Sequence, residues 1–407
     1  PRGLASDRWY WYRFHALGQR SATGRTRTSP EEDATATSLR FAIASCQRYD
    51  AGHFAAWRHL AGLPLDLVVF LGDYIYEYAS PPGALRAHEG PLTRTLEQYR
   101  ARYAQYKRDP ALQAAHAAFP WLTVWDDHEV DNDYANLQGQ SLQDDFAAQR
   151  AAAYQAYWEH MPFPKAARPK GPDMRIYDRH DWGRLARIHA LDDRQYRDPQ
   201  GCPRPGRGGS NTVKLKDCPA LLDPKRSLLG DAQERLLAEG WDLQRPWNLL
   251  AQQTLMARFA WGPPAEGPYW TDGWDGYAPS RNRLLQTVRD RRVPGVVALG
   301  GDVHAHYVAE LKADYDDDKS PVVASEFCGT SISSRGLAQE RIAAAQPHNP
   351  HLLHARGDQR GYVAFELNER ALQARLMAVA QPDDPASAVN VAARYVVEAA
   401  RPGPRPA

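Results

Sequence analysis

The chain has 407 residues and a mass of 45.7 kDa, and 43% of its residues are hydrophobic, which is enough for a large core in one or two domains. Lys and Arg number 50 and Asp and Glu 49, and this near-neutral balance argues against a general nucleic-acid-binding surface, which would show a basic excess. The longest apolar runs, such as residues 67–71, are far shorter than the roughly 18 residues of a membrane-spanning helix, so no span is expected.

The two ends of the chain differ from its middle. Residues 9–14 alternate like a β-strand, and a Gly-, Ser-, Thr- and Arg-rich stretch follows them. We interpret residues 1–38 as the end of a separate N-terminal β domain with a linker, residues 39–385 as the main domain and residues 386–407 as a tail. The tail is Pro-rich from Arg401 onward and is expected to be disordered. No signal peptide is visible, and we expect that an upstream segment has been removed.

Five short apolar runs stop at Gly or at polar residues, which is the pattern of strands that are buried on both faces. Because ligands gather at the carboxyl ends of strands in layered α/β sheets, we expect the side chains at these ends to converge on one site. The runs cover residues 41–46, 67–71, 122–125, 247–253 and 294–299. The polar residues at or just beyond their ends are Cys46, Asp73, Asp126, Gln252 and Asp302.

Helical stretches separate these predicted strands. Residues 95–107 and 143–160 are rich in Ala, Gln and Tyr at helical spacing, and residues 231–241 and 281–291 are two further candidates. Strands that alternate with helices favour an α/β (α+β) domain built in layers.

Two of the four cysteines, Cys202 and Cys218, lie in one Gly- and Pro-rich loop. A pair that closes a flexible loop is typical of a disulfide, and a disulfide implies an oxidising compartment. The alternative is two reduced loop thiols.

The segment Gly-Asp-Tyr-Ile-Tyr after the second strand carries the first metal-binding pattern. A carboxylate at Asp73 can bridge two cations, and Tyr76, three residues further on, can reach the same metal. Phenolate suits ferric iron far better than Zn²⁺ or Mg²⁺. The alternative is a turn Asp beside a packed Tyr. Cys46 is either a buried structural cysteine or a thiolate ligand.

Two further patterns follow later strands. The adjacent carboxylates of Asp126 and Asp127, with the imidazole of His128, repel one another unless a cation lies there. Asp302 and His304 are two residues apart, so in an extended chain they face the same way, which suits one pair of metals. The alternatives are a solvated acidic loop and a structural His.

Together these segments resemble the PhoD-like alkaline phosphatases, a branch of the calcineurin-like metallophosphoesterases. The matching motifs, between about residue 40 and about residue 381, are ASCQ, LGDYIYEY, WDDHEVDND, LDDRQYRD, WNLLAQQ, WDGYAPSR, ALGGDVHAH and SEFCGTSISS. The resemblance implies a four-layer sandwich of two packed mixed β-sheets flanked by helices over residues 39–385. It also implies an N-terminal immunoglobulin-like domain, of which residues 1–38 would be the remnant.

The resemblance further implies a Tat-exported, extracytoplasmic (periplasmic or secreted) enzyme that contains Fe³⁺ and Ca²⁺. Asp73 would then be the bridging carboxylate. The expected ligands on the iron side are Cys46, Tyr76 and His304, and the candidates on the calcium side are Asp126, Asp127, Gln252 and Asp302. Asp127 takes the place of Asn in the usual Gly-Asn-His-Glu motif, and Asp302 the place of the first His in Gly-His-x-His. Carboxylates in place of nitrogen donors favour a hard cation such as Ca²⁺, with Zn²⁺, Mn²⁺ or Mg²⁺ as alternatives.

The expected reaction is hydrolysis of phosphate mono- or diesters by a water that the two cations activate. His128 is a candidate to protonate the leaving group or to bind a phosphoryl oxygen. Arg194 is a candidate phosphate clamp, because guanidinium matches phosphate oxygens bidentately, or else the structural partner of Asp192 or Asp193.

Two other functions are compatible with the sequence. A metal-dependent nuclease or a phospholipase D-type lipid phosphodiesterase would use the same scaffold with a different pocket rim. A non-catalytic secreted calcium-binding protein is the second, although Tyr76 and Cys46 would have no purpose in it. The expected partner is a phosphate-ester substrate, and the expected state is a monomer.

Overall fold

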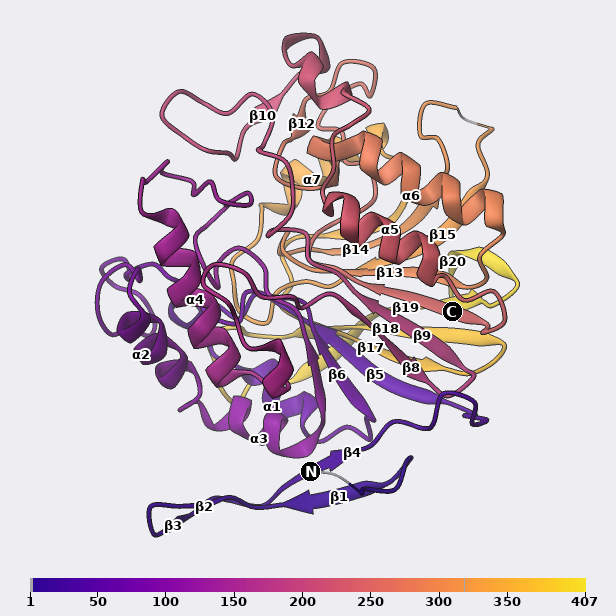
Figure 1. Cartoon of the computed structure of the whole chain (residues 1–407). Coiled ribbons are helices and arrows are strands. Elements are labelled where there is room, and N and C mark those ends of the chain that lie inside the picture. Colours follow the sequence, from indigo (N-terminus) through magenta and orange to yellow (C-terminus); the bar gives the residue numbers. More distant parts are fainter. Residues whose placement is uncertain (1–2, 318) are drawn as a thin grey trace.

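The computed structural model describes residues 3–317 and 319–407. Two seven-stranded mixed sheets pack against each other, and helices cover both outer faces (Figure 1). The predicted four-layer sandwich is therefore confirmed. Within the described residues, none of the helices combines the length and the apolar character that crossing a membrane requires.

The first sheet has the strand order β20-β19-β18-β17-β5-β6-β7. Strands β5, β6 and β7 are parallel, and the remaining strands join the β5 side as an antiparallel meander. The strands are β5 (Leu39–Ala44), β6 (Leu67–Phe70), β7 (Trp121–Thr123), β17 (Gly361–Leu367), β18 (Ala371–Val379), β19 (Val389–Glu398) and β20 (Arg401–Pro406).

The second sheet has the order β16-β14-β15-β13-β11-β9-β8. Its centre, β9-β11-β13-β15, is parallel, and antiparallel strands form both edges. The strands are β8 (Asp178–Trp182), β9 (Ala186–Ala190), β11 (Trp247–Ala251), β13 (Val296–Gly300), β14 (His306–Lys312), β15 (Val322–Cys328) and β16 (Leu352–Arg356).

Helices α1 to α4 cover the first sheet side and helices α5 to α7 the second (Figure 1). Their bounds are α1 (Ala55–Leu60), α2 (Leu96–Tyr106), α3 (Pro110–Ala118), α4 (Phe146–His160), α5 (Gly230–Gly240), α6 (Ala278–Arg291) and α7 (Gln339–Ala345). The four helices expected from the sequence correspond to α2, α4, α5 and α6. The short helices α1, α3 and α7 were not predicted.

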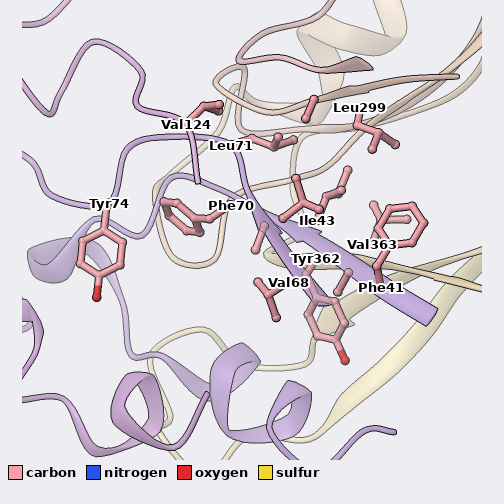
Figure 2. Close-up of a cluster of buried hydrophobic side chains, with 14 of the residues drawn as sticks. Phe41, Ile43, Val68, Phe70, Leu71, Tyr74, Val124, Leu299, Tyr362 and Val363 are labelled. Carbon is pink, nitrogen blue, oxygen red and sulfur yellow. The ribbon is translucent and has the colours of Figure 1, made fainter. Parts of the chain in front are cut away.

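Alternate residues of the central strands of the second sheet enter two different cores. Leu249 packs between the two sheets, whereas Leu250 packs under the helices of the second side. This period of two explains why these strands are continuous apolar runs. Figure 2 shows the inter-sheet core, in which Ile43 and Val363 of the first sheet cluster with Leu299 of the second.

The N-terminal residues form small sheets outside the sandwich (Figure 1). Strand β1 (Trp9–Tyr12) pairs with β4 (Gly24–Arg27), and β2 (His15–Ala16) pairs with β3 (Gln19–Arg20). An ion pair between Arg27 and Asp66 ties this segment to the loop before β6.

The C-terminal segment is ordered, and the expectation that it is disordered from Arg401 onward is wrong. Residues 389–398 and 401–406 form β19 and β20 of the first sheet. The prolines of β20 are compatible with a strand because β20 lies at the edge of the sheet, where a missing N–H breaks no ladder.

The expected disulfide between Cys202 and Cys218 is confirmed. It closes the loop that carries β10 (Thr212–Val213), which pairs with β12 (Tyr269–Trp270). The loop is thereby attached to the segment that precedes α6.

Replacing both Cys202 and Cys218 by Ser should lower the free energy of unfolding. The cysteines are 16 residues apart, and the chain-entropy estimate for a loop of that size is about 3 kcal/mol. Urea unfolding of the oxidised protein and of the double variant measures the difference. Equal midpoints for the two proteins would show that the bond does not stabilise the fold.

Candidate metal centre

The loops after four parallel strands bring the predicted ligands together. Cys46 follows β5, Asp73 and Tyr76 follow β6, the Asp126–His128 segment follows β7, and Asp302 and His304 follow β13. Three overlapping groups have ligand atoms within 4.8 Å of one another. They are Cys46 with Asp73 and His304, Asp73 with Asp127 and His128, and Asp126 with Asp127 and Asp302.

Several of these residues adopt the left-handed backbone conformation that non-glycine residues rarely adopt. The φ angles are 58° at Cys46, 60° at Asp73, 62° at Asp302 and 52° at His304. Such conformations cost of order 1–3 kcal/mol each and persist only where the surroundings hold them. The ligand loops therefore need strong anchors.

The carboxylate of Glu129 is one such anchor. It accepts hydrogen bonds from the backbone N–H groups of Asp73 at 3.0 Å, Tyr74 at 2.6 Å and Asp126 at 2.9 Å. The loop after β6 and the loop after β7 are thus held by one buried side chain. Burial raises the pKa of Glu129 to about 7 despite these hydrogen bonds.

On one side of the centre, three different donor types meet at Asp73. The Tyr76 hydroxyl donates to Asp73 Oδ2 at 2.8 Å and lies 3.1 Å from His304 Nε2. His304 Nδ1 lies 2.8 Å from the carbonyl oxygen of Arg335, so it donates there and Nε2 keeps its lone pair. Burial lowers the pKa of His304 to about 3, which keeps the ring neutral and able to bind a metal. The thiol of Cys46 completes this set.

On the other side, four carboxylates meet at Arg194, and three of them are buried. The Arg194 guanidinium bonds to Asp126 through Nε, and its Nη2 lies 3.7 Å from Asp127 and 3.9 Å from Asp302. Its Nη1 contacts Asp272 at 2.7 Å. The guanidinium is therefore surrounded by carboxylates, whereas its contact with Asp192 is made by its backbone N–H.

One arginine does not neutralise this group of carboxylates evenly. Burial raises the pKa of Asp126 to about 7, and burial also raises the pKa of Asp302 well above its ordinary value. Burial acts on Asp127 as well, but Arg194 and His128 outweigh it and hold the pKa of Asp127 below its ordinary value. The site would need further positive charge to keep all three carboxylates ionised.

The donor atoms of both sides fit metal ions. Asp126 Oδ2 and Asp302 Oδ2 are buried and have no hydrogen-bond partner among the described residues, which is costly unless a cation binds them. The Cys46 side combines thiol, phenol, imidazole and carboxylate, a set that suits a ferric ion. The Asp126 side offers oxygen alone, which suits Ca²⁺.

His128 lies between the two sides and has a fixed ring orientation. Its Nδ1 lies 2.7 Å from Glu77 Oε2, and its ring packs on Tyr76 with the centroids 4.0 Å apart. Burial alone would lower the pKa of His128, but the carboxylates of Glu77, Asp73 and Asp127 outweigh it and raise that pKa well above its ordinary value. Nε2 of the ring forms no hydrogen bond with the described residues.

Gln252 lies at the end of β11 as expected, but its side-chain amide is engaged locally. The amide oxygen accepts hydrogen bonds from Thr254 N at 3.1 Å and Trp274 Nε1 at 3.0 Å, and the amide nitrogen donates to the carbonyl of Thr254. Both lone pairs of this oxygen are used, so Gln252 is not among the ligands proposed below.

Four further residues contact the cluster and were not predicted from the sequence. Asp272 forms a group with Asp127 and Asp133, and Ser334 lies 2.7 Å from the Tyr76 hydroxyl. Glu77 and Glu129 lie next to predicted ligands, inside the motifs LGDYIYEY and WDDHEVDND, and their position in these motifs was the available signal. Asp272 has no such signal, because it is far from the other ligands in the chain.

A cavity of about 970 Å³ opens beside the cluster. Asp73, Asp127, His128, Asp302 and His304 are among its lining residues. Other lining residues come from the loop after β11, from β12 and from α7. A second cavity of about 1020 Å³, between β7 and β8, contains none of the predicted ligands.

Three comparisons with known proteins point to the same family. The sequence model of the family described as PhoD-like phosphatase matches residues 41–376. A protein of Bacillus subtilis (strain 168) named alkaline phosphatase D is 39% identical over 415 residues, which cover 99% of this chain and 70% of that protein. A solved structure described as "Structure of PhoD" superposes with a TM-score of 0.92 at 38% identity, covering 99% of this chain and 78% of that one.

Replacing Glu129 by Gln should lower metal affinity by about 10- to 100-fold, the usual effect of losing a group that orients ligands. The amide presents N–H groups to backbone donors, so the loops after β6 and β7 lose part of their anchor. Metal content after dialysis against graded chelator measures the change.

Glu326→Gln is the matched control. The buried Glu326 carboxylate likewise accepts two backbone hydrogen bonds, from Met256 at 2.6 Å and Ala257 at 2.7 Å, but neither residue is a candidate ligand. This variant should be destabilised without losing metal. Equal metal loss in both variants would show that Glu129 acts only through overall stability.

Proposed function

Because the chain belongs to the PhoD-like phosphatase family and is a phosphoester hydrolase, we propose that its reaction takes place at an Fe³⁺/Ca²⁺ centre built from the clustered loops. The observation that supports this proposal most is the pairing of two different donor sets. One contains thiol, phenol and imidazole, the other contains carboxylates alone, and Asp73 and Asp127 lie in the group that connects them. A centre with two unlike cations needs two unlike sets of ligands.

In this proposal the iron is held by Cys46, Asp73, Tyr76 and His304, and calcium by Asp126, Asp127 and Asp302, with Asp73 shared. Zn²⁺, Mn²⁺ and Mg²⁺ are the alternative metals. When bound, the cations supply Lewis-acid chemistry, since they withdraw charge from phosphoryl oxygens and make water more acidic. The protein residues hold these ligands in place and move the proton.

His128 is the proposed proton donor to the leaving group. Its raised pKa keeps the ring protonated at neutral pH, and Glu77 fixes the Nδ1 side at 2.7 Å. Nε2 has no hydrogen-bond partner among the described residues, so its N–H is available to an alkoxide oxygen. The carboxylates of Asp73 and Asp127 hold the charged ring near the reacting phosphate.

Arg194 is proposed to position the carboxylates and to balance part of their charge. Its side chain is only 1% exposed, and Asp126 and Asp272 already occupy Nε and Nη1. A phosphate clamp needs a free pair of guanidinium nitrogens, which this geometry does not offer. The role as phosphate clamp is therefore not part of the proposal.

We further propose that the enzyme works outside the cytoplasm, after Tat export, on phosphate mono- or diesters. The disulfide supports an oxidising location.

Tyr76→Phe tests the identity of the metal. If Tyr76 binds ferric iron as phenolate, the protein purified without chelator has a visible charge-transfer band, and the variant loses or shifts it. Visible absorption with elemental analysis gives the result. A colourless, active protein without iron would leave only the Zn²⁺, Mn²⁺ or Mg²⁺ versions of the proposal.

Asp73→Asn and His128→Ala separate a ligand from a proton donor. The neutral amide of the first variant cannot balance two adjacent cations, so metal and activity should be lost together. The second variant should keep its metal and lose roughly 10²–10⁴-fold in rate on alkyl esters, the usual size of a general-acid contribution. Its loss should be smaller on nitrophenyl esters, whose leaving group needs little protonation.

Metal content and kcat/KM on the two ester types measure both effects. Glu77→Gln removes the partner of His128 while keeping the ring, so it should show the same dependence on the leaving group in weaker form. Equal losses of His128→Ala on both ester types would place His128 on the phosphoryl oxygens, and loss of metal would make it a ligand.

A further inference from the structure

The cavity beside the cluster is much larger than a phosphate group requires. Its volume of about 970 Å³ is at the upper end of the range for sites that enclose a drug-sized ligand. The candidate metal ligands form only part of its lining. The remaining space must therefore accommodate the organic part of the ester or stay largely filled with water.

Part of the cavity wall is aromatic. Phe259, Trp261 and Trp270 line it, and Trp261 is one of the partly exposed residues packed on the core under α5 to α7. Phe259 supports Trp261 edge to face, with ring centroids 4.7 Å apart, so the indole has a fixed position. The hydrophobic core thus reaches the surface inside the cavity.

Three exposed arginines stand on the rim of the same cavity, namely Arg204, Arg335 and Arg341. None of the three has an ion-pair partner in the part of the chain that the structure describes. Arg341 lies over the Trp261 ring, with its guanidinium carbon 5.2 Å from the centroid. The guanidinium and the indole each present a planar surface on which a flat ring can stack.

We propose that Trp261, supported by Phe259 and flanked by Arg341, binds a planar aromatic group in the alcohol part of the ester. This inference rests on the proposed hydrolysis of phosphate esters at the neighbouring centre. The substrate class it names is a phosphodiester with a nucleobase-like ring, held with the phosphate at the cluster and the ring on the indole. Trp261 is accordingly a specificity-determining residue.

The test uses the metal-loaded, full-length protein and compares three methyl phosphodiesters as substrates, namely those of thymidine, deoxyribose and decanol. The first two differ only in the base, and the third is apolar without being planar. Product formation is followed by phosphorus NMR. The wild type should favour thymidine over deoxyribose, and Trp261→Ala should lower this ratio of kcat/KM about tenfold, as expected for one lost stacking contact. Trp261→Phe should restore part of the ratio.

Trp158→Ala is the matched control, because Trp158 is also partly exposed, packs on the other core and carries an arginine, Arg168, at 5.7 Å. This variant should leave the ratio unchanged. Two results would overturn the planar subsite. One is an unchanged ratio in Trp261→Ala, and the other is a loss of kcat/KM in this variant that is as large for the decyl ester as for the thymidine ester. If no diester is hydrolysed, the diester substrate class is overturned, whereas the monoester form of the proposed function stands. The relative affinities of the same intact compounds, measured by calorimetry, then test whether the indole binds a planar ring.

Discussion

The three backbone hydrogen bonds that the buried Glu129 carboxylate accepts hold the loop after β6 against the loop after β7. This one side chain links the backbones of Asp73 and Asp126 directly. Asp73 also has a left-handed backbone, which a free loop would abandon. The sandwich brings the strand ends into the same neighbourhood, but contact at the scale of a metal site needs this additional clamp.

Charge is the second constraint on the centre. Asp272 is shared between Arg194 and Arg197, each at 2.7 Å, so its charge is balanced within the protein. Asp126 bonds to Arg194 Nε, and Asp302 lies 3.9 Å from Arg194 Nη2. Each of the two carboxylates keeps a buried oxygen that accepts no hydrogen bond from the described residues. The protein alone therefore leaves the carboxylate side incomplete, and a hard cation would complete it without rearranging the fold.

Much of this arrangement could be predicted from the sequence, because parallel strands buried on both faces leave a simple pattern. An apolar run followed by Asp73 or by Asp302 predicts a buried strand and also the end of the strand at which the candidate ligand lies. Asp272 could not be found in this way, since only the tertiary fold brings it to Arg194. Gln252 lies at the predicted strand end, but the sequence does not reveal that its amide forms hydrogen bonds with Thr254 and Trp274. The Pro-rich C-terminus was wrongly expected to be disordered, because composition does not reveal the edge of a sheet.

The loop closed by Cys202 and Cys218 has a consequence for selectivity. Arg204, Ser210 and Thr212 of this loop line the cavity beside the candidate metal ligands, while neither cysteine belongs to the candidate metal cluster. One wall of this cavity is thus covalently fixed only when the thiols are oxidised. A chain folded in a reducing environment would keep its ligand loops but present a looser wall, so the range of esters it accepts would depend on the redox history of each molecule.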